Sequence, residues 1–376
     1  MKYDLEQYLS QSVARLVGRI AKATIKNPKA SLFMARYARR SAAAAQKRKE
    51  AEDRGEHIPA FLIAGITTSC NLHCKGCYAR ANHSCADETP RKNAVLTTEE
   101  WNRIFGEAEE LGIAFILLAG GEPFMRPEVL SAAGGHPGIL FPVFTNGTLF
   151  TEKNTALLEK YPTLLPILSI EGDRRRTDER RGSGGYDRLT DTMALLKKKA
   201  VPFGCSVTVQ RNNISEVLSE DFVGNLSQSG CGAVIYVEYV PAEGGTEDQA
   251  LSEKERRLMD EDLAALREKF PEMIFLSFPG DEEAMGGCLA SGRGFFHINA
   301  FGAAEPCPFS PFSDRNLKDH SLKEALNSPL FIRLRNSSLQ EIPHNGGCAL
   351  FGQEDQIRKI LGEKVGPPKN ESPKRL

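Results

Sequence analysis

The chain lacks several features that would place it in common classes of protein. Its 376 residues carry a formal net charge of −1, which argues against binding nucleic acid through a broadly basic surface. No apolar run approaches the ~20 residues that a membrane-spanning helix needs, and residues 1–26 alternate apolar and charged side chains, unlike a signal peptide. The nine cysteines are odd in number and follow no regular framework, which argues against a secreted disulfide scaffold. We therefore expect a soluble protein of a reducing compartment, the cytoplasm.

Three of the cysteines stand close together after an apolar run. Cys70, Cys74 and Cys77 are separated by three and by two residues. Three thiolates on one loop can each bind one iron of a cuboidal iron–sulfur cluster, which leaves the fourth iron open for chemistry. A structural zinc site usually needs four ligands, often as two separated pairs. His73 and His83 do not lie at a usual spacing for a further zinc ligand, so we favour a cluster.

This motif resembles the signature of the radical SAM superfamily, Cys-x3-Cys-x2-Cys on the loop after the first barrel strand. The resemblance implies that Cys70, Cys74 and Cys77 hold a 4Fe–4S cluster whose open iron chelates S-adenosylmethionine. It also implies reductive cleavage of that cofactor to a 5′-deoxyadenosyl radical, which abstracts hydrogen from a substrate, and a reducing partner such as flavodoxin or ferredoxin. One residue departs from the pattern, because the usual aromatic residue before the third cysteine is Gly76 here, for which Tyr78 could substitute.

From residue 60 the chain alternates strand-like and helix-like stretches. The clearest helix is Thr97–Leu111, which opens with a capping box between Thr97 and Glu100. Strand–helix repeats build a parallel sheet with right-handed crossovers. Six units are too few for a complete eight-stranded barrel and match the partial (β/α)6 TIM-type barrel that the resemblance implies. The six apolar runs are Phe61–Ile66, Ala114–Ala119, Leu140–Thr145, Leu165–Ile170, Phe203–Val209 and Val234–Val240.

A glycine-rich turn ends the second of these runs. It consists of Gly120, Gly121, Glu122 and Pro123. In a parallel barrel the turns after the strands face the ligand, and adjacent glycines let the backbone approach a ligand closely. The resemblance implies that this turn holds the amino group of S-adenosylmethionine.

Four residues after the next two runs also match cofactor-binding positions of the superfamily. Asn146, in Thr-Asn-Gly, is either a turn former or a residue near the cluster. Ser169 and Glu171 match the ribose-binding position, where a hydroxyl and a carboxylate suit two ribose hydroxyls, although the usual acid there is Asp. Arg181 resembles the arginine that pairs with the cofactor carboxylate, a task that suits a planar guanidinium. We interpret the four other arginines of residues 174–181 as a solvated loop.

A second set of cysteines lies near the C-terminus. Cys288 is followed by thirteen residues, Gly302, four further residues and Cys307, and Cys348 comes later. The pattern resembles the opening of the SPASM domain, but the dense cysteine run of a full SPASM domain is absent. Three cysteines can hold one auxiliary cluster, as in the shortened twitch domain, with a fourth ligand that is absent, exogenous or not cysteine. We favour this cluster over three buried thiols, and interpret the remaining cysteines as structural: Cys85, Cys205 and Cys231.

These patterns divide the chain into four segments. We predict a basic helical extension (1–57), a radical SAM core barrel (58–279), a small SPASM/twitch-like iron–sulfur domain (280–352), and a C-terminal helix with a disordered tail (353–376). The extension carries about +7, with 13 Lys and Arg against 6 Asp and Glu. Peripheral membrane contact would suit that charge, but we favour a helix that docks on the barrel through the apolar stripe Leu5, Leu9, Val13, Leu16 and Ile20.

The favoured function is a radical SAM oxidoreductase that modifies a peptide or a small molecule, with net oxidation aided by the auxiliary cluster. The alternative is a two-cluster electron carrier or scaffold that does not cleave S-adenosylmethionine. The turn at 120–123, Ser169 and Glu171 argue against a carrier, because a carrier needs no nucleoside pocket. A zinc-binding interaction protein would leave the strand–helix units unexplained. The sequence does not select the substrate.

Overall fold

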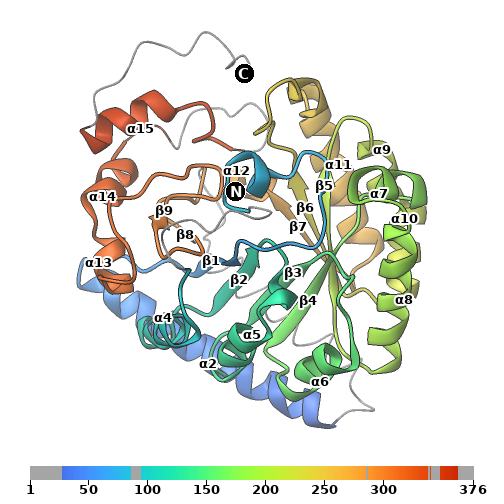
Figure 1. Ribbon diagram of the computed structural model, residues 1–376, viewed down its shortest axis with the longest axis horizontal. Coiled ribbons are helices and arrows are strands. Elements are labelled where there is room, and N and C mark those ends of the chain that lie inside the picture. Colours follow the sequence, from blue (N-terminus) through green and yellow to red (C-terminus); the bar gives the residue numbers. More distant parts are fainter. Residues whose placement is uncertain (1–27, 86–94, 285–286, 338, 340–347, 363–376) are drawn as a thin grey trace.

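The computed structural model describes residues 28–85, 95–284, 287–337, 339 and 348–362 (Figure 1). The apolar stripe predicted for residues 5–20 and the predicted tail from 366 onward lie outside these residues. None of the helices in the described ranges has the length and apolar character needed to cross a bilayer.

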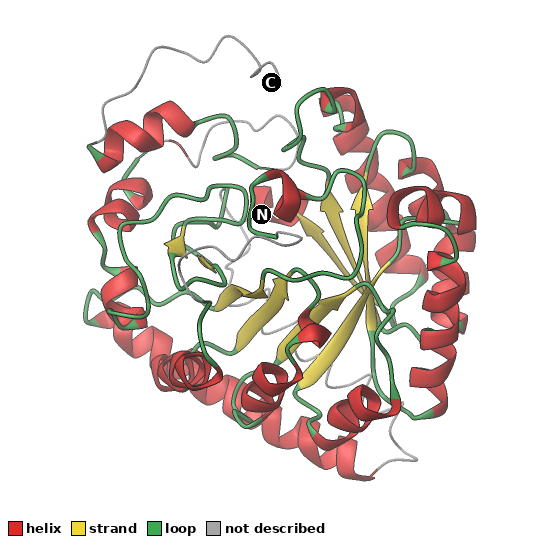
Figure 2. Cartoon of the chain, viewed as in Figure 1, coloured by secondary structure: helices red, strands yellow, loops and turns green. Residues whose placement is uncertain are grey.

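Seven parallel strands form the centre of the fold, in sheet order β7-β6-β5-β4-β3-β2-β1. Helices surround them on the outside, as Figure 2 shows. The parallel α/β architecture is therefore confirmed, and the six predicted runs all form strands. The strands are β1 (Phe61–Thr67), β2 (Phe115–Gly120), β3 (Phe141–Thr145), β4 (Leu164–Ser169), β5 (Gly204–Val209), β6 (Ala233–Glu238) and β7 (Ile274–Phe278).

β7 was not predicted. It pairs in parallel with β6 in a register that joins Ala233 to Ile274. It follows α11 (Glu253–Lys269), the long helix that crosses back from β6. The prediction stopped at six units because this five-residue strand directly precedes the segment where the strand–helix alternation ends.

The helices between the strands form where caps and apolar faces coincide. In α4 (Thr98–Leu111) the predicted capping box between Thr97 and Glu100 is present, and Gly112 ends the helix in the left-handed conformation. The other helices of the barrel region are α3 (Tyr78–Ala81), α5 (Pro127–Gly134), α6 (Glu152–Lys160), α7 (Arg174–Arg181), α8 (Gly185–Lys198), α9 (Ile214–Val217) and α10 (Glu220–Gln228), with 3-10 turns η1 (Pro123–Met125) and η2 (Glu247–Gln249).

The described part of the N-terminal extension packs against the barrel. Its helix α2 (Pro28–Asp53) runs past α4 (Figure 1). The buried Tyr37 hydroxyl donates to the carbonyl of Ala114 at 3.0 Å, and the Arg48 guanidinium donates to the carbonyl of Gly112. Both acceptors lie between α4 and β2, so this helix fixes the start of β2.

The C-terminal region joins the same sheet. Strand β8 (His297–Ile298) pairs in parallel with β1, and β9 (Ala304–Glu305) pairs antiparallel with β8. The rings of Phe61 and Phe295 stack at 5.0 Å. Residues of this region belong to the same apolar core as the barrel helices. The region therefore packs as a continuation of the barrel. Its helices are α12 (Gly280–Ala284), α13 (Leu322–Leu326), α14 (Pro329–Arg335) and α15 (Glu354–Leu361).

Candidate functional site

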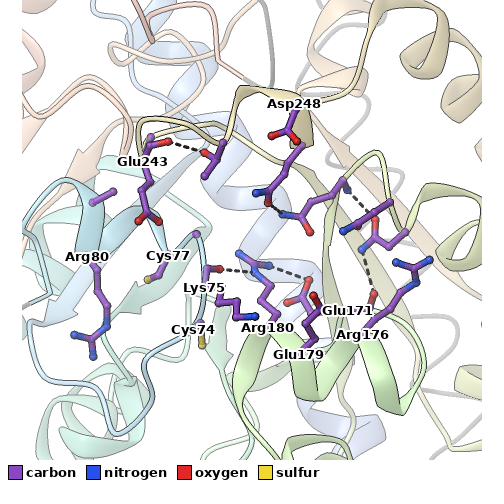
Figure 3. A pocket seen from close by; sticks show the side chains of 18 of the residues that line it. Cys74, Lys75, Cys77, Arg80, Glu171, Arg176, Glu179, Arg180, Glu243 and Asp248 are labelled. Carbon is purple, nitrogen blue, oxygen red and sulfur yellow. Dashed lines mark hydrogen bonds and ion pairs between the residues drawn. The ribbon is translucent and has the colours of Figure 1, made fainter. Parts of the chain in front are cut away.

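The predicted cluster loop lies at the carboxyl end of β1, beside α7. Cys70, Cys74 and Cys77 are all partly exposed, and Figure 3 shows two of them at the edge of a cavity. The loop is tied to α7 by two hydrogen bonds, from the Lys75 backbone N–H to the Arg180 carbonyl (2.9 Å) and from Arg180 Nε to the Lys75 carbonyl (3.1 Å). Each thiol is thus held on a loop that a second element fixes.

The donor set of this loop fits an iron–sulfur cluster better than a single ion. Within the described ranges, no three Cys, His, Asp or Glu side chains converge as one bound metal ion would require. In a cuboidal cluster each thiolate binds a different iron, so such convergence is not needed. Burial raises the pKa of the Cys74 thiol, against the nearby charge of Arg181, whose Nη1 lies 4.0 Å from the sulfur. That guanidinium would stabilise a thiolate bound to iron.

The glycine turn after β2 lies directly on the cluster loop. A Cβ on Gly121 would stand 2.0 Å from the carbonyl oxygen of Ser69 and 3.1 Å from the backbone nitrogen of Cys70. The backbone N–H groups of Gly121 and Glu122 donate to the carbonyls of Thr67 and Ser69, both at 2.8 Å. Because Gly121 has no side chain, this turn can contact the backbone that carries the first cysteine.

Glu122 anchors the turn to β3. Its side chain, 1 % exposed, accepts hydrogen bonds from Thr145 Oγ1 and the Asn146 backbone N–H, both at 2.8 Å, and from the Phe124 N–H at 3.1 Å. Burial raises the pKa of this carboxyl group, against these three donors. Pro123 is buried at the first position of η1. In the described structure Glu122 therefore holds the turn together.

Asn146 connects the same network to the cluster loop. Its Nδ2 donates to Oδ1 of Asn71, at 2.9 Å, and Asn71 in turn donates to the Thr148 hydroxyl at 2.8 Å. Its Oδ1 accepts from the backbone N–H and hydroxyl of Thr148. Asn146 is therefore a turn former whose amide also holds the residue next to Cys70.

Glu171 and two arginines form a charged group at the end of β4. One carboxylate oxygen of Glu171 accepts from Arg181, and the other lies 2.8 Å from Arg180. That second oxygen is buried and accepts no hydrogen bond from the described residues, although it is ion-paired. An acceptor in this state can bind a ligand hydroxyl. Ser169 lies at the end of the same strand, and the hydroxyl of Ser206 donates to its hydroxyl at 3.2 Å.

A cavity of about 1010 Å³ lies between this charged group and the cluster loop (Figure 3). Its walls include residues that the sequence prediction did not select, from the loops after β5 and β6. Gln210 donates to Gln249 at 2.8 Å, and Asn213 donates to the carbonyl of Glu171 at 3.1 Å. Arg180, interpreted as a solvated loop residue, also lines the cavity, and its side chain is only 13 % exposed. The position of Gln210 and Asn213 directly after the fifth apolar run was a signal that could have identified them.

The missing aromatic residue of the cluster motif has a structural counterpart. Gly76 has φ +64°, and a Cβ there would stand 2.8 Å from the hydroxyl oxygen of Tyr239. Tyr239 follows β6, and its hydroxyl donates to the Thr246 hydroxyl at 3.0 Å. Tyr78 packs instead against Phe309 of the C-terminal region, with ring centroids 5.0 Å apart. The ring that lies beside Gly76 is therefore that of Tyr239.

The three C-terminal cysteines come together in the fold. Cys288, Cys307 and Cys348 are 7, 6 and 5 % exposed, and the sulfurs of Cys307 and Cys348 lie 4.0 Å apart. Backbone N–H groups lie near each of the three sulfurs and favour the thiolate form; they belong to Ala290, Phe309, Leu350 and Phe351. Buried thiols with N–H donors fit the ligand set of a cluster, because such hydrogen bonds stabilise metal-bound thiolates.

Among the cysteines interpreted as structural, Cys205 and Cys231 are buried and hydrogen-bonded to each other, and Cys85 is buried against Cys70.

A buried histidine–carboxylate pair lies beside β1, and the sequence prediction missed it. His297 Nδ1 lies 2.7 Å from Glu305 Oε2, with both side chains 7 % exposed, and Asn299 donates to the other oxygen at 2.5 Å. His297 is the register partner of Ile63 on β1, and its Nε2 is the atom nearest to the Cβ position of Gly65, at 3.2 Å. The pair links β8 and β9 beside the strand that leads to the cluster loop.

Comparison with known proteins agrees with this geometry. Residues 65–218 match the model of the radical SAM superfamily. The AdoMet-dependent heme synthase of Methanosarcina barkeri is 28 % identical over 74 % of this chain and 86 % of the relative. The mycofactocin maturase MftC of Mycolicibacterium smegmatis is 26 % identical over 81 % of this chain and 79 % of the relative.

Solved structures share the fold. Streptococcus suis SuiB bound to S-adenosylmethionine superimposes with a TM-score of 0.63 at 17 % identity, over 77 % of this chain and 71 % of SuiB. The structure of anSMEcpe with bound AdoMet gives a TM-score of 0.58 at 17 % identity, over 76 % and 84 % of the two chains. Residues 65–218 therefore form a domain of the radical SAM superfamily, whose members use a 4Fe–4S cluster and S-adenosylmethionine.

Proposed function

We propose that this protein is a radical SAM oxidoreductase that modifies a peptide or a small molecule in the cavity above its cluster loop. The observation that carries the proposal is one cavity of about 1010 Å³ lined by Cys74 and Cys77 on one side and by Glu171 and Arg180 on the other. The glycine turn contacts the same cysteine loop, and Arg181 pairs with Glu171. An electron carrier needs no cavity of this kind.

The residues that line the cavity, and those directly beside it, suit distinct parts of S-adenosylmethionine. Cys70, Cys74 and Cys77 would hold the 4Fe–4S cluster, which supplies the electron that cleaves the cofactor and so gives a radical able to abstract hydrogen. Arg181, 4.0 Å from the Cys74 sulfur, would pair with the cofactor carboxylate. The unsatisfied oxygen of Glu171 would accept from a ribose hydroxyl, with Ser169 on the same strand.

The C-terminal region would contribute a second, auxiliary cluster of the SPASM/twitch type at Cys288, Cys307 and Cys348. The functions of two relatives bear on the substrate. One relative is a heme synthase and the other a maturase, which supports a tetrapyrrole-like small molecule and a peptide, respectively. Strand β8, which lies between Cys288 and Cys307 along the chain, pairs with β1. An auxiliary cluster in this region would accept the electron released in a net oxidation. Reduction of the first cluster requires a donor such as flavodoxin or ferredoxin.

The test is an anaerobic assay of cofactor cleavage. Protein reconstituted with iron and sulfide, then reduced with dithionite, should convert S-adenosylmethionine to 5′-deoxyadenosine and methionine. The triple variant of Cys70, Cys74 and Cys77 to Ala should form no 5′-deoxyadenosine. Formation at the wild-type rate by that variant would refute the proposal, and absence of cleavage by the fully loaded wild type would favour the electron carrier.

A further inference from the structure

A buried carboxylate lies beside the three C-terminal cysteines. Glu282, on α12, is 6 % exposed. Its carboxylate accepts a hydrogen bond at 3.3 Å from the backbone N–H of Leu289, the residue after Cys288, and it lies close enough to the Cys288 thiol to interact with it. Its charge also acts on Cys348. A carboxylate and three thiols, all of them buried, therefore lie in the same part of the C-terminal region.

Among the residues that the structure describes, no lysine, arginine or histidine forms a direct ion pair with Glu282. Arg293 is the cation whose charge acts on Glu282. Its guanidinium donates a hydrogen bond to the backbone carbonyl of Cys288 at 3.0 Å. A carboxylate buried without a directly paired cation is costly unless something else balances its charge. Direct coordination of the carboxylate to an iron of a cluster bound to the neighbouring thiols would offset that cost.

We propose that Glu282 is the fourth ligand of the auxiliary cluster, with one carboxylate oxygen bound to the iron that Cys288, Cys307 and Cys348 leave without a thiolate. This inference rests on the auxiliary cluster of the proposed function. Carboxylate oxygen is a hard ligand but an established one for iron. The spacing of the cysteines could not identify this ligand, because it precedes Cys288 by six residues and is not a cysteine.

A role follows for the auxiliary cluster. With Glu282 bound, all four irons have protein ligands, so the cluster has no open position for substrate. It then acts as an electron acceptor, and the substrate binds elsewhere in the cavity beside the first cluster. A three-cysteine cluster with an open iron would instead serve as a substrate anchor.

The test uses the full chain with the first site removed, so that only the C-terminal site binds iron. In the Cys70, Cys74 and Cys77 to Ala background we compare Glu282→Gln, Glu282→Cys and Asp281→Asn. Asp281 is the matched control because it neighbours Glu282 but binds Arg267 (2.8 Å) and the Ser277 N–H (2.8 Å). Iron content and electron paramagnetic resonance spectra are measured before and after mild oxidation.

The background protein, the Cys variant and the Asn control should keep roughly four irons. The Gln variant should lose about one, from the corner without an anionic ligand, and gain the signal of a three-iron cluster. Glu282→Gln that retains the iron and spectrum of its parent would overturn the assignment. So would loss of the whole cluster from both the Gln and the Cys variants, which would make Glu282 a structural residue.

Failure of the auxiliary cluster itself would look different. Adding Cys288, Cys307 and Cys348 to Ala in the same background should remove the remaining iron. If iron binding persists there, the cluster assignment fails, and the Glu282 proposal fails with it.

Discussion

Replacing Gly121 by alanine should displace the cluster loop. The added Cβ would lie 2.0 Å from the Ser69 carbonyl oxygen, whereas ordinary contacts begin at 3.4 Å, so that carbonyl must retreat by about 1.4 Å. The Ser69 carbonyl is part of the backbone of one loop, and the new Cβ is attached to the backbone of the other. The two backbones are hydrogen-bonded to each other, so neither atom can rotate away. Gly121 does not have a positive φ, so the effect is steric and not conformational. Overpacking of this kind costs about 1–3 kcal/mol.

The functional effect should exceed the effect on stability, because Ser69 is followed directly by Cys70. A misplacement of about 1 Å in a catalytic geometry can reduce the rate on the order of 100-fold. We expect Gly121→Ala to form 5′-deoxyadenosine at about one hundredth of the wild-type rate. We also expect less iron to be bound at the first site. The assay is anaerobic product formation, with iron measured in the background that lacks the C-terminal cysteines.

Gly106→Ala is the matched control. Gly106 lies within α4, and a Cβ there meets only His136 Cε1 at 3.8 Å. Alanine in a helix interior should stabilise the protein by about 0.5–1 kcal/mol and leave cleavage unchanged. Wild-type iron content and cleavage in Gly121→Ala would refute the argument that this turn supports the cluster loop.

Three further changes test other contacts. Arg181→Ala should weaken S-adenosylmethionine binding about 10- to 100-fold, since it removes a charge-assisted partner from the cofactor and from Glu171; equilibrium binding would show it, and unchanged affinity would contradict the assigned role. Tyr37→Phe should destabilise the protein by about 0.5–1.5 kcal/mol, because it removes one buried hydrogen bond to the Ala114 carbonyl, which keeps the Leu140 N–H as its other donor; an unchanged denaturation midpoint would show that this contact is dispensable. Thr97→Ala should cost about 1 kcal/mol through loss of the cap of α4, and a thermal midpoint equal to that of wild type would count against the cap.

The sequence predicted the parts of the fold that local pattern determines. Apolar runs and the Thr97 cap are local signals, and the structure confirms them. The sequence did not predict β7, whose strand character depends on pairing with β6. It also did not predict the pairing of β8 with β1, which joins residues more than 230 positions apart. Sequence pattern carries little information about such long-range pairings, because two-residue strands have no periodicity.

The candidate site divides in the same way. Residues within recognisable motifs could be selected from the sequence, and the structure brings the cysteine loop, the glycine turn and Glu171 to one end of the sheet. Tyr239 lies outside the recognised motifs, and Glu282, His297 and Glu305 lie beside or between Cys288 and Cys307 at positions that the cysteine pattern does not mark. They acquire their neighbours only through folding, so no spacing rule could have identified them.

The pairing of β8 with β1 limits how freely the C-terminal region can be exchanged between relatives. Without residues after 279, the N–H and C=O groups of β1 that bond β8 would face solvent, and Phe61 would lose its stacking partner Phe295. An exposed edge strand of this kind is a template for aggregation. A transplanted C-terminal module would therefore have to supply a matching strand for β1. In chimeric enzymes the unit of exchange should be the module together with its complementary edge, and the distance between the two iron sites should be set by the sheet and not by a linker.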